Sequence, residues 1–183
     1  VERATVAGHS MGGQAAIALA LAHPERVERL VLSAPAGIET FTEPEGAAIR
    51  GFWTDERLRN RSEAVARASY GFVFARWDDD VERLLQARMA VDGTPRFDGL
   101  LRAVQRSVAG MLDEPVADRL GELSMPVLYV YGPADKMIPA VALHPDQTPD
   151  TIAEAARAAI PDLTVVRLEG AGQCVHRGHV FPV

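Results

Sequence analysis

Ser10 is the residue of this sequence whose neighbours point most directly to chemistry. It stands at the centre of Gly8-His9-Ser10-Met11-Gly12, a G-x-S-x-G pattern. The pattern is typical of a serine on a sharp turn between a strand and a helix, where glycines on either side leave room for the neighbouring backbone. Such a hydroxyl can attack a carbonyl carbon if a histidine takes its proton and a carboxylate orients that histidine. The pattern therefore predicts an acid and a base elsewhere in the chain.

Asp135 is the candidate for the acid. It follows the apolar stretch MPVLYVYG at residues 125–132, and open α/β sheets place functional side chains just beyond the carboxyl ends of their strands. A carboxylate at that position could hold a histidine and stabilise its charged form. The alternative is an aspartate that shapes a loop turn together with Pro133.

Strand and helix patterns alternate around these residues. Residues 5–8 have the character of a strand end, and residues 12–23 form a helical pattern of small apolar side chains. Residues 148–160 begin with a threonine cap and an early proline, which predicts a helix leading into a last strand. Three continuous apolar runs are typical of parallel strands covered on both faces: residues 29–34, 125–132 and 163–168. The sequence therefore predicts an α/β fold with a parallel sheet and flanking helices.

The stretch between the second and third of these strands has a different character. Helical periodicity occurs at residues 55–70, 80–91 and 97–109. The acidic run at residues 78–80 is expected to cap a helix rather than to hold a metal. Most of the aromatic side chains of the chain lie here, and they could line a substrate cleft or form the core of the segment itself: Phe41, Phe52, Trp53, Tyr70, Phe72, Phe74, Trp77 and Phe97. We interpret this segment as an inserted helical cap.

Three motifs, in this order, resemble the α/β-hydrolase superfamily, and in particular its cap-bearing serine hydrolases. They are GHSMGG at residues 8–13, HPERVERLVLSAPAG at residues 23–37 and MPVLYVYGPADKMIP at residues 125–139. The resemblance implies a partial α/β-hydrolase fold that begins at the nucleophile strand. Its expected parts are a core at residues 1–36, a helical cap insertion at 37–120 and a second part of the core at 121–183, which holds the acid strand, a helix, the last strand and the tail.

The resemblance implies Ser10 as the nucleophile and Asp135 as the acid, but the base departs from the family pattern. The family carries its histidine directly after a glycine-rich loop, where this sequence has Gln173 in EGAGQCVHRGHV. A glutamine amide forms hydrogen bonds but cannot accept and return a proton near neutral pH. His176 is the candidate base if the loop rearranges toward Ser10, and His179 lies further along.

The remaining histidines are not expected to act as the base. His9 is expected to flank the serine with its side chain turned away from it, and His23 and His144 lie beside prolines in predicted loops with no visible partner. The Met11 backbone N–H is the expected oxyanion donor. The resemblance also implies a second donor and further strands before Val1, so we expect this chain to be a fragment of a larger hydrolase.

Composition excludes some classes of function. The chain has 183 residues, 48% of them hydrophobic, a net charge of -6 and no basic stripe, which argues against nucleic acid as a partner. No apolar run approaches the roughly 20 residues of a membrane span. The single cysteine, Cys174, favours a reducing compartment and hence a cytoplasmic location. Cys174, His176 and His179 are expected to be surface loop residues rather than metal ligands, and no cofactor is implied.

Three hypotheses for function follow. The first is a serine hydrolase that acts on an ester-like or ketonic carbonyl of an apolar small molecule, impaired by Gln173 and by the missing upstream strands. The second is a non-catalytic α/β-hydrolase-like protein that retains the fold and the pocket to bind a ligand. The third is an incomplete fragment without function of its own.

Overall fold

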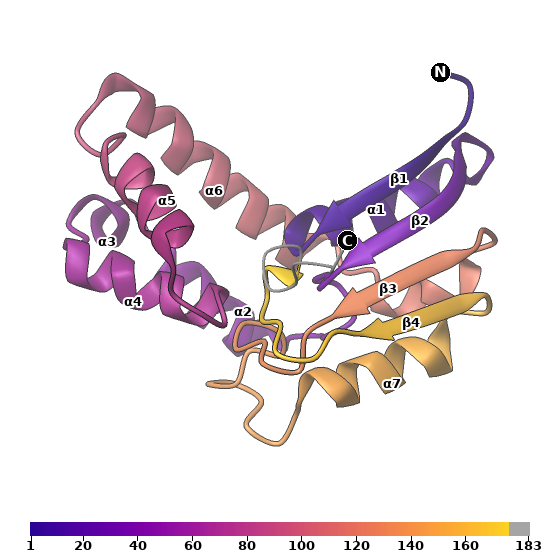
Figure 1. Cartoon of the computed structure of the whole chain (residues 1–183). Helices are drawn as coiled ribbons and strands as arrows, with labels where there is room; N and C mark the ends of the chain where they lie inside the picture. The colour runs from indigo at the N-terminus through magenta and orange to yellow at the C-terminus, as the bar shows by residue number, and fades with distance from the viewer. Residues whose placement is uncertain (176–183) are drawn as a thin grey trace.

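The computed structural model describes residues 1–175, and a parallel sheet forms the centre of this part of the chain. The sheet order is β1-β2-β3-β4, and every neighbouring pair is parallel (Figure 1). The strands are β1 (Ala4–His9), β2 (Val27–Ser33), β3 (Val127–Tyr131) and β4 (Leu163–Arg167). Because all strands run in the same direction, their carboxyl ends meet at one edge of the sheet. The predicted α/β class with a parallel sheet is confirmed.

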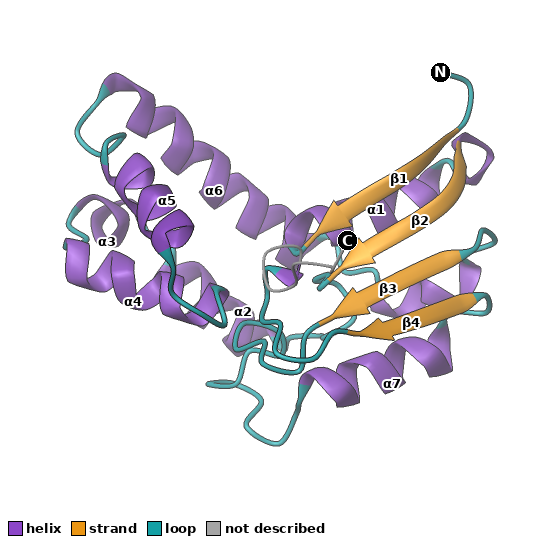
Figure 2. Ribbon diagram, in the orientation of Figure 1, coloured by secondary structure: helices purple, strands orange, loops and turns teal. Residues whose placement is uncertain are grey.

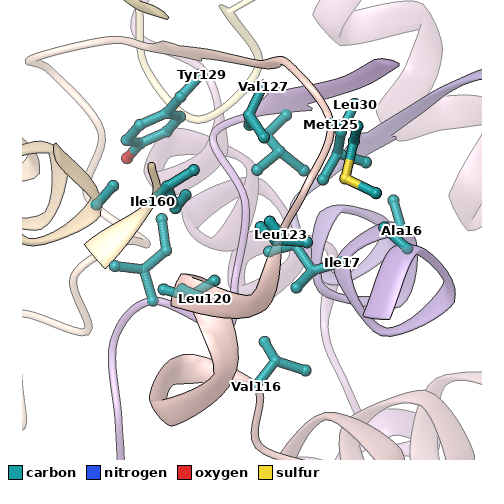
Figure 3. Packing of buried hydrophobic residues seen from close by; sticks show 14 of the residues in the cluster. Ala16, Ile17, Leu30, Val116, Leu120, Leu123, Met125, Val127, Tyr129 and Ile160 are labelled. Carbon is teal, nitrogen blue, oxygen red and sulfur yellow. The ribbon is translucent and has the colours of Figure 1, made fainter. Parts of the chain in front are cut away.

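A short 3-10 helix, η1 (Pro24–Arg26), lies between α1 (Met11–Ala22) and β2 and has no buried residue. One face of the sheet is covered by α1, α7 (Pro149–Ala159) and a second 3-10 helix, η2 (Ala117–Glu122). Alternate side chains of β2 and β3 enter one hydrophobic cluster with these helices, as Figure 3 shows for Ile17, Leu120 and Tyr129. The other face is less covered, since Val31, Leu128 and Val130 are only half-buried. Burial on the first face is therefore the main source of hydrophobic stabilisation in the described part of the sheet.

Helices occupy the chain between β2 and β3, and they lie beyond the carboxyl ends of the strands (Figure 2). We call residues 43–113 the insertion. Its helices are α2 (Glu43–Phe52), α3 (Asp55–Arg59), α4 (Glu63–Val73), α5 (Asp79–Met89) and α6 (Pro95–Asp113). Leu58, Phe97 and Leu101 form a small core within it, separate from the main cluster.

The helices of the insertion differ from the predicted ones in two places. The helix predicted at residues 55–70 is wrong as a single element, because α3 ends at Arg59 and Ser62 caps a new helix by accepting a hydrogen bond from the Val65 N–H at 3.3 Å. Helix α2 was not predicted. Its signal was in the sequence, since Thr42 and Glu45 form a capping box with Pro44 in the first turn.

The aromatic side chains of the insertion do not share one environment. Phe97 is buried and Trp53 packs against its cluster, whereas Phe52, Phe72 and Trp77 are exposed by 55%, 49% and 41%. An interpretation of these side chains as mainly a core therefore applies to a minority of them. The acidic run caps a helix as expected, because Asp78 accepts a hydrogen bond from the Val81 N–H at 2.9 Å at the start of α5.

Candidate active site

Ser10 lies on the turn between β1 and α1, at the carboxyl edge of the sheet. Its backbone has φ 54° and ψ -127°, a conformation that is strained for any residue other than glycine. Hydrogen bonds on both sides hold it there. The Ser10 N–H donates to the Ser33 carbonyl at 3.1 Å, and its own carbonyl accepts from Gly13 and Ala36 at 2.8 and 3.0 Å. The surrounding fold thus fixes the hydroxyl at the strand end.

Two glycines make this turn possible. A side-chain carbon on Gly8 would lie 2.2 Å from the Gly12 carbonyl oxygen, and one on Gly13 would lie 2.6 Å from the Pro35 Cβ. Gly12 itself has nothing within 4 Å of that position. The pattern places glycines at Gly8 and Gly12, and the structure needs the space at Gly8 and at the following Gly13.

Asp135 reaches the same edge from the loop after β3. Its carboxylate is only 6% exposed, and Oδ1 accepts hydrogen bonds from the Met137 and Ile138 N–H groups at 2.8 and 3.2 Å. Burial raises the pKa of Asp135 to about 6, and the two backbone donors oppose that rise. We call residues 132–148 the acid loop.

Gln173 comes from the loop after β4 and lies between the other two side chains. It is 3% exposed. In the amide orientation that satisfies both neighbours, Nε2 donates to the Asp135 carboxylate and Oε1 accepts from the Ser10 hydroxyl at 2.9 Å. In the opposite orientation, Nε2 donates to the Ala34 carbonyl at 3.3 Å. The first orientation forms a continuous row, Ser10 to Gln173 to Asp135, which we call the serine row.

One side-chain contact and one backbone hydrogen bond fix the Gln173 loop. His9 Nε2 lies 2.9 Å from the Gln173 backbone oxygen, so the residue before the serine holds the loop that carries the amide. The Cys174 N–H donates to the Val73 carbonyl at 3.3 Å, which places the end of α4 against the same loop. The candidate base His176 and its neighbour His179 lie outside the described residues.

Met11 is the first residue of α1, directly after Ser10. The first N–H groups of a helix have no carbonyl partner within the helix, and they carry the positive end of its dipole. The Met11 N–H therefore lies at the N-terminal end of α1, beside Ser10.

Sequence reasoning missed Gln14, which ties α1 to the insertion. This buried amide donates to the Met111 and Glu114 carbonyls at 2.8 and 2.9 Å, at the end of α6. The available signal was a single polar side chain on an otherwise apolar helix. The contact fixes the insertion next to the serine.

His144 was also misjudged, because it has partners that the sequence did not show. Its ring contacts the carboxylates of Glu39 and Glu45, which precede it by about a hundred residues. No local pattern could have paired side chains so far apart in the chain. The ring stacks on Phe41 with centroids 5.5 Å apart.

Other kinds of site were sought in the described part of the chain. Among residues 1–175, no group of three or more His, Cys, Asp or Glu side chains is arranged to hold a metal ion. None of the helices in the same range is long and apolar enough to cross a membrane.

The strand, turn and helix around Ser10 and the position of Asp135 after β3 define a class of protein. The family described as alpha/beta hydrolase fold matches residues 1–176, and this chain belongs to that family.

Its relatives include hydrolases of bacterial origin. The chain is 31% identical over 145 residues to a 2-hydroxy-6-oxononadienedioate/2-hydroxy-6-oxononatrienedioate hydrolase of Paraburkholderia phymatum, covering 76% of this chain and 48% of that protein. It is 34% identical over 147 residues to a 2-hydroxymuconate semialdehyde hydrolase of a Pseudomonas species, with the same coverage of 76% and 48%. The chain thus spans about half the length of the curated relatives it matches.

A solved structure is similar over almost the whole chain. It is that of a probable hydrolytic enzyme from Pseudomonas aeruginosa, with a TM-score of 0.72 and 27% sequence identity. The similarity covers 94% of this chain and 58% of that one. The fold seen here is therefore part of an α/β-hydrolase fold.

Proposed function

We propose that this chain carries the site of a serine hydrolase that acts on a carbonyl group of an apolar small molecule, with its turnover impaired at the base. Ser10 is the nucleophile, Asp135 the acid and the Met11 N–H an oxyanion donor. The observation that carries this proposal is the serine row, in which the Gln173 amide lies between the hydroxyl and the carboxylate. In a working triad that position belongs to the proton acceptor.

The chemistry follows from the order of groups in the row. When Ser10 Oγ attacks a carbonyl carbon, its proton must leave as the new C–O bond forms. The Gln173 oxygen accepts the hydrogen bond of the hydroxyl, but an amide oxygen does not take up a proton near neutral pH. Ser10 is consequently positioned for attack without being activated.

The substrate class in this proposal is an ester-like or ketonic carbonyl. Both curated relatives named above are hydrolases whose printed names denote oxo or semialdehyde compounds, and this favours the carbon-carbon cleavage of a ketone. The insertion is proposed to act as a cap that selects the substrate. Its contacts through Val73 and Gln14 support this role, since both lie beside the loops of the serine row. A cytoplasmic location and the absence of a nucleic acid partner are part of the same proposal.

A non-catalytic binding role is the second candidate, and one observation favours it. The Gln173 amide satisfies Ser10 and Asp135 together in a buried site, so the row forms a complete hydrogen-bonded unit without any proton acceptor. A ligand with a carbonyl group could then bind at the Met11 N–H and leave unchanged.

Labelling with a fluorophosphonate tests the proposal, because this probe forms a covalent bond only with an activated serine. Circular dichroism first establishes that each chain is folded, which addresses the possibility of a non-functional fragment. The unmodified chain is compared with Ser10→Ala, His176→Ala and Gln173→His, and mass spectrometry maps the modified residue.

We expect Ser10 to be labelled in the Gln173→His variant, about 10²–10⁴ times faster than in the unmodified chain, since that is the typical contribution of a general base. Labelling of the unmodified chain that is lost in His176→Ala would instead identify His176 as the base. If folded Gln173→His is not labelled, the hydrolase proposal fails and the binding role stands.

A further inference from the structure

A second polar cluster lies outside the serine row and links two parts of the chain that are far apart in sequence. Its members are Glu39, in the segment that follows β2, Glu45 in the first turn of α2, and His144 in the acid loop. His144 Nδ1 lies 2.5 Å from Glu39 Oε1, and its Nε2 lies 3.3 Å from Glu45 Oε1. We call these three side chains the histidine clamp.

The clamp is largely shielded from water. The side chains of Glu39, His144 and Glu45 are exposed by 5%, 15% and 25%. The Phe41 ring stacks on the imidazole at an interplanar angle of 14°. Because a buried carboxylate without a partner is strongly destabilising, the approach of two carboxylates to one imidazole favours the charged form of the ring.

The titratable groups around the clamp act on its charges in both directions. The hydrogen bond that the His144 ring donates to Glu39 raises the pKa of His144, and Glu45 acts in the same direction. Burial raises the pKa of Glu39 despite the neighbouring imidazole, while the Thr42 backbone and side chain lower the pKa of Glu45. The negative charge of Asp135 is the next group in range, and it interacts unfavourably with Glu39.

The clamp is also joined to Asp135 through the backbone of the acid loop. The Ala140 N–H donates to both Glu39 oxygens at 2.9 and 3.2 Å, and the Ala140 carbonyl accepts from the His144 N–H at 2.9 Å. On the other side of the loop, the Asp135 carboxylate binds the N–H groups of Met137 and Ile138. The loop is thus fastened at one end by its own acid and at the other by the clamp.

We propose that His144 is a positioning residue whose charged imidazole fastens the acid loop to the segment that leads into the insertion. The placement of Asp135 and of the insertion then depends on the protonation of a histidine that does not touch the serine. The meaning of this for catalysis rests on the proposed role of Asp135, but the clamp itself does not.

The direction of the pH dependence follows from the sign of the shift. A histidine whose pKa is raised by folding stabilises the protein fully below its unfolded pKa of about 6.5, and this contribution is lost as the pH rises through the folded pKa. Above that pH, Glu39 and Glu45 lose their shared cation. The acid loop should therefore open more often in mildly alkaline solution than in mildly acidic solution.

Hydrogen exchange of the whole chain, corrected for the intrinsic effect of pH, tests the clamp at pH 5.5 and pH 8.5. The peptides that cover residues 37–46 and 135–145 are compared in the unmodified chain, in His144→Gln and in Glu45→Gln. His23→Gln is the matched control, because His23 faces Glu25 at 3.6 Å on the surface, where both side chains are well exposed.

We expect both peptides of the unmodified chain to exchange about tenfold faster at pH 8.5 than at pH 5.5, as for a local opening that costs less at high pH. His144→Gln should exchange fast at both pH values, and His23→Gln should match the unmodified chain. Equal protection at both pH values in the unmodified chain, or unchanged protection in folded His144→Gln, would overturn the proposal.

An NMR titration of His144 and a labelling experiment test the clamp in two further ways. An NMR titration of the His144 ring in the unmodified chain should give a pKa above that of a free histidine, and Glu45→Gln should lower this pKa. A pKa at or below that of a free histidine would overturn the clamp, even if His144→Gln does not fold.

In the Gln173→His background, adding His144→Gln should slow Ser10 labelling at pH 5.5, whereas adding His23→Gln should not. Absence of labelling in Gln173→His itself would count against the proposed function alone, since exchange and titration do not depend on Ser10.

Discussion

The serine row and the histidine clamp contain related side chains in different arrangements. In the row, a serine and a carboxylate face a neutral amide. In the clamp, an imidazole faces two carboxylates and no nucleophile. Both ring nitrogens of His144 are engaged by carboxylates, so this histidine is not free to serve Ser10. In the proposed mechanism, the chemistry therefore depends on the one residue between Ser10 and Asp135, and not on how many titratable groups the edge of the sheet holds.

The two regions also differ in the way their charges are compensated. Asp135 is buried beside neutral donors, and its pKa is raised to about 6. The Glu39 side chain is 5% exposed, but it faces the imidazole of His144, whose pKa is raised. Protonation of Asp135 therefore stabilises the serine row, and protonation of His144 stabilises the histidine clamp.

The largest expected effect concerns the acid of the row once a base is present. In the Gln173→His background, Asp135→Asn should slow fluorophosphonate labelling of Ser10 by about 10³–10⁴-fold, because the introduced imidazole loses the carboxylate that orients it and stabilises its charge. Asp146→Asn, an exposed change in the same acid loop, is the control and should leave the rate unchanged. Equal rates in the two variants would remove Asp135 from the proposed mechanism.

The turn that carries Ser10 can be disrupted without changing any residue of the histidine clamp. Gly8→Ala should destabilise the fold by about 3 kcal/mol, because its Cβ would meet the Gly12 carbonyl at 2.2 Å and backbone would have to move. Gly12→Ala is the matched control, with nothing within 4 Å of its Cβ, and should be neutral or more stable by up to about 1 kcal/mol. Urea unfolding measures both. A similar loss in the two variants would show that the pattern matters as a whole and not through the close approach at Gly8.

The two regions should separate in the pH dependence of stability. A raised carboxyl pKa means that the unfolded chain ionises first, so Asp135 should reduce the unfolding free energy by up to about 3 kcal/mol as the pH rises from about 4 to about 6. The loss due to His144 should follow at higher pH. Asp135→Asn should flatten only the acidic part of the curve and His144→Gln only the alkaline part. A single variant that flattened both would mean that the regions titrate together.

The smallest expected effect is the stabilisation that the amide gives to the row. Gln173→Ala should cost about 2 kcal/mol at pH 7, since it leaves buried groups of Ser10 and Asp135 unpaired. The cost should decrease below pH 6, where Asp135 is protonated. Gln86→Ala, which removes an exposed amide, controls for the loss of a glutamine. A cost that does not vary with pH would argue against the contact between Gln173 and Asp135.

Local patterns carried much of the fold. The serine turn, the strand runs and the capped helix α7 were all predictable, because each depends on neighbours in sequence. Helix α2 was not predicted although its capping box was present. The break after Arg59 was not predicted because it depends on a single residue, the Ser62 cap of the next helix. Propensity over a long window hides such single-residue signals.

The site residues also divide into those that local sequence predicts and those whose partners are distant in sequence. Ser10 and Asp135 were predicted because each follows a strand, and parallel strands bring their carboxyl ends together. The partners of His144 could not be predicted, since Glu39 and Glu45 meet it only after the acid loop folds back on the chain.

The pH dependence of Ser10 labelling in Gln173→His tests the central claim most directly, because it reports on the proton acceptor itself. The account predicts a rate that rises to a plateau with a midpoint within about pH 6–8, the range of a histidine, and an unmodified chain that stays slow throughout. A folded Gln173→His variant that labels no faster than the unmodified chain, or with the same pH dependence, would show that Gln173 does not occupy the position of the base.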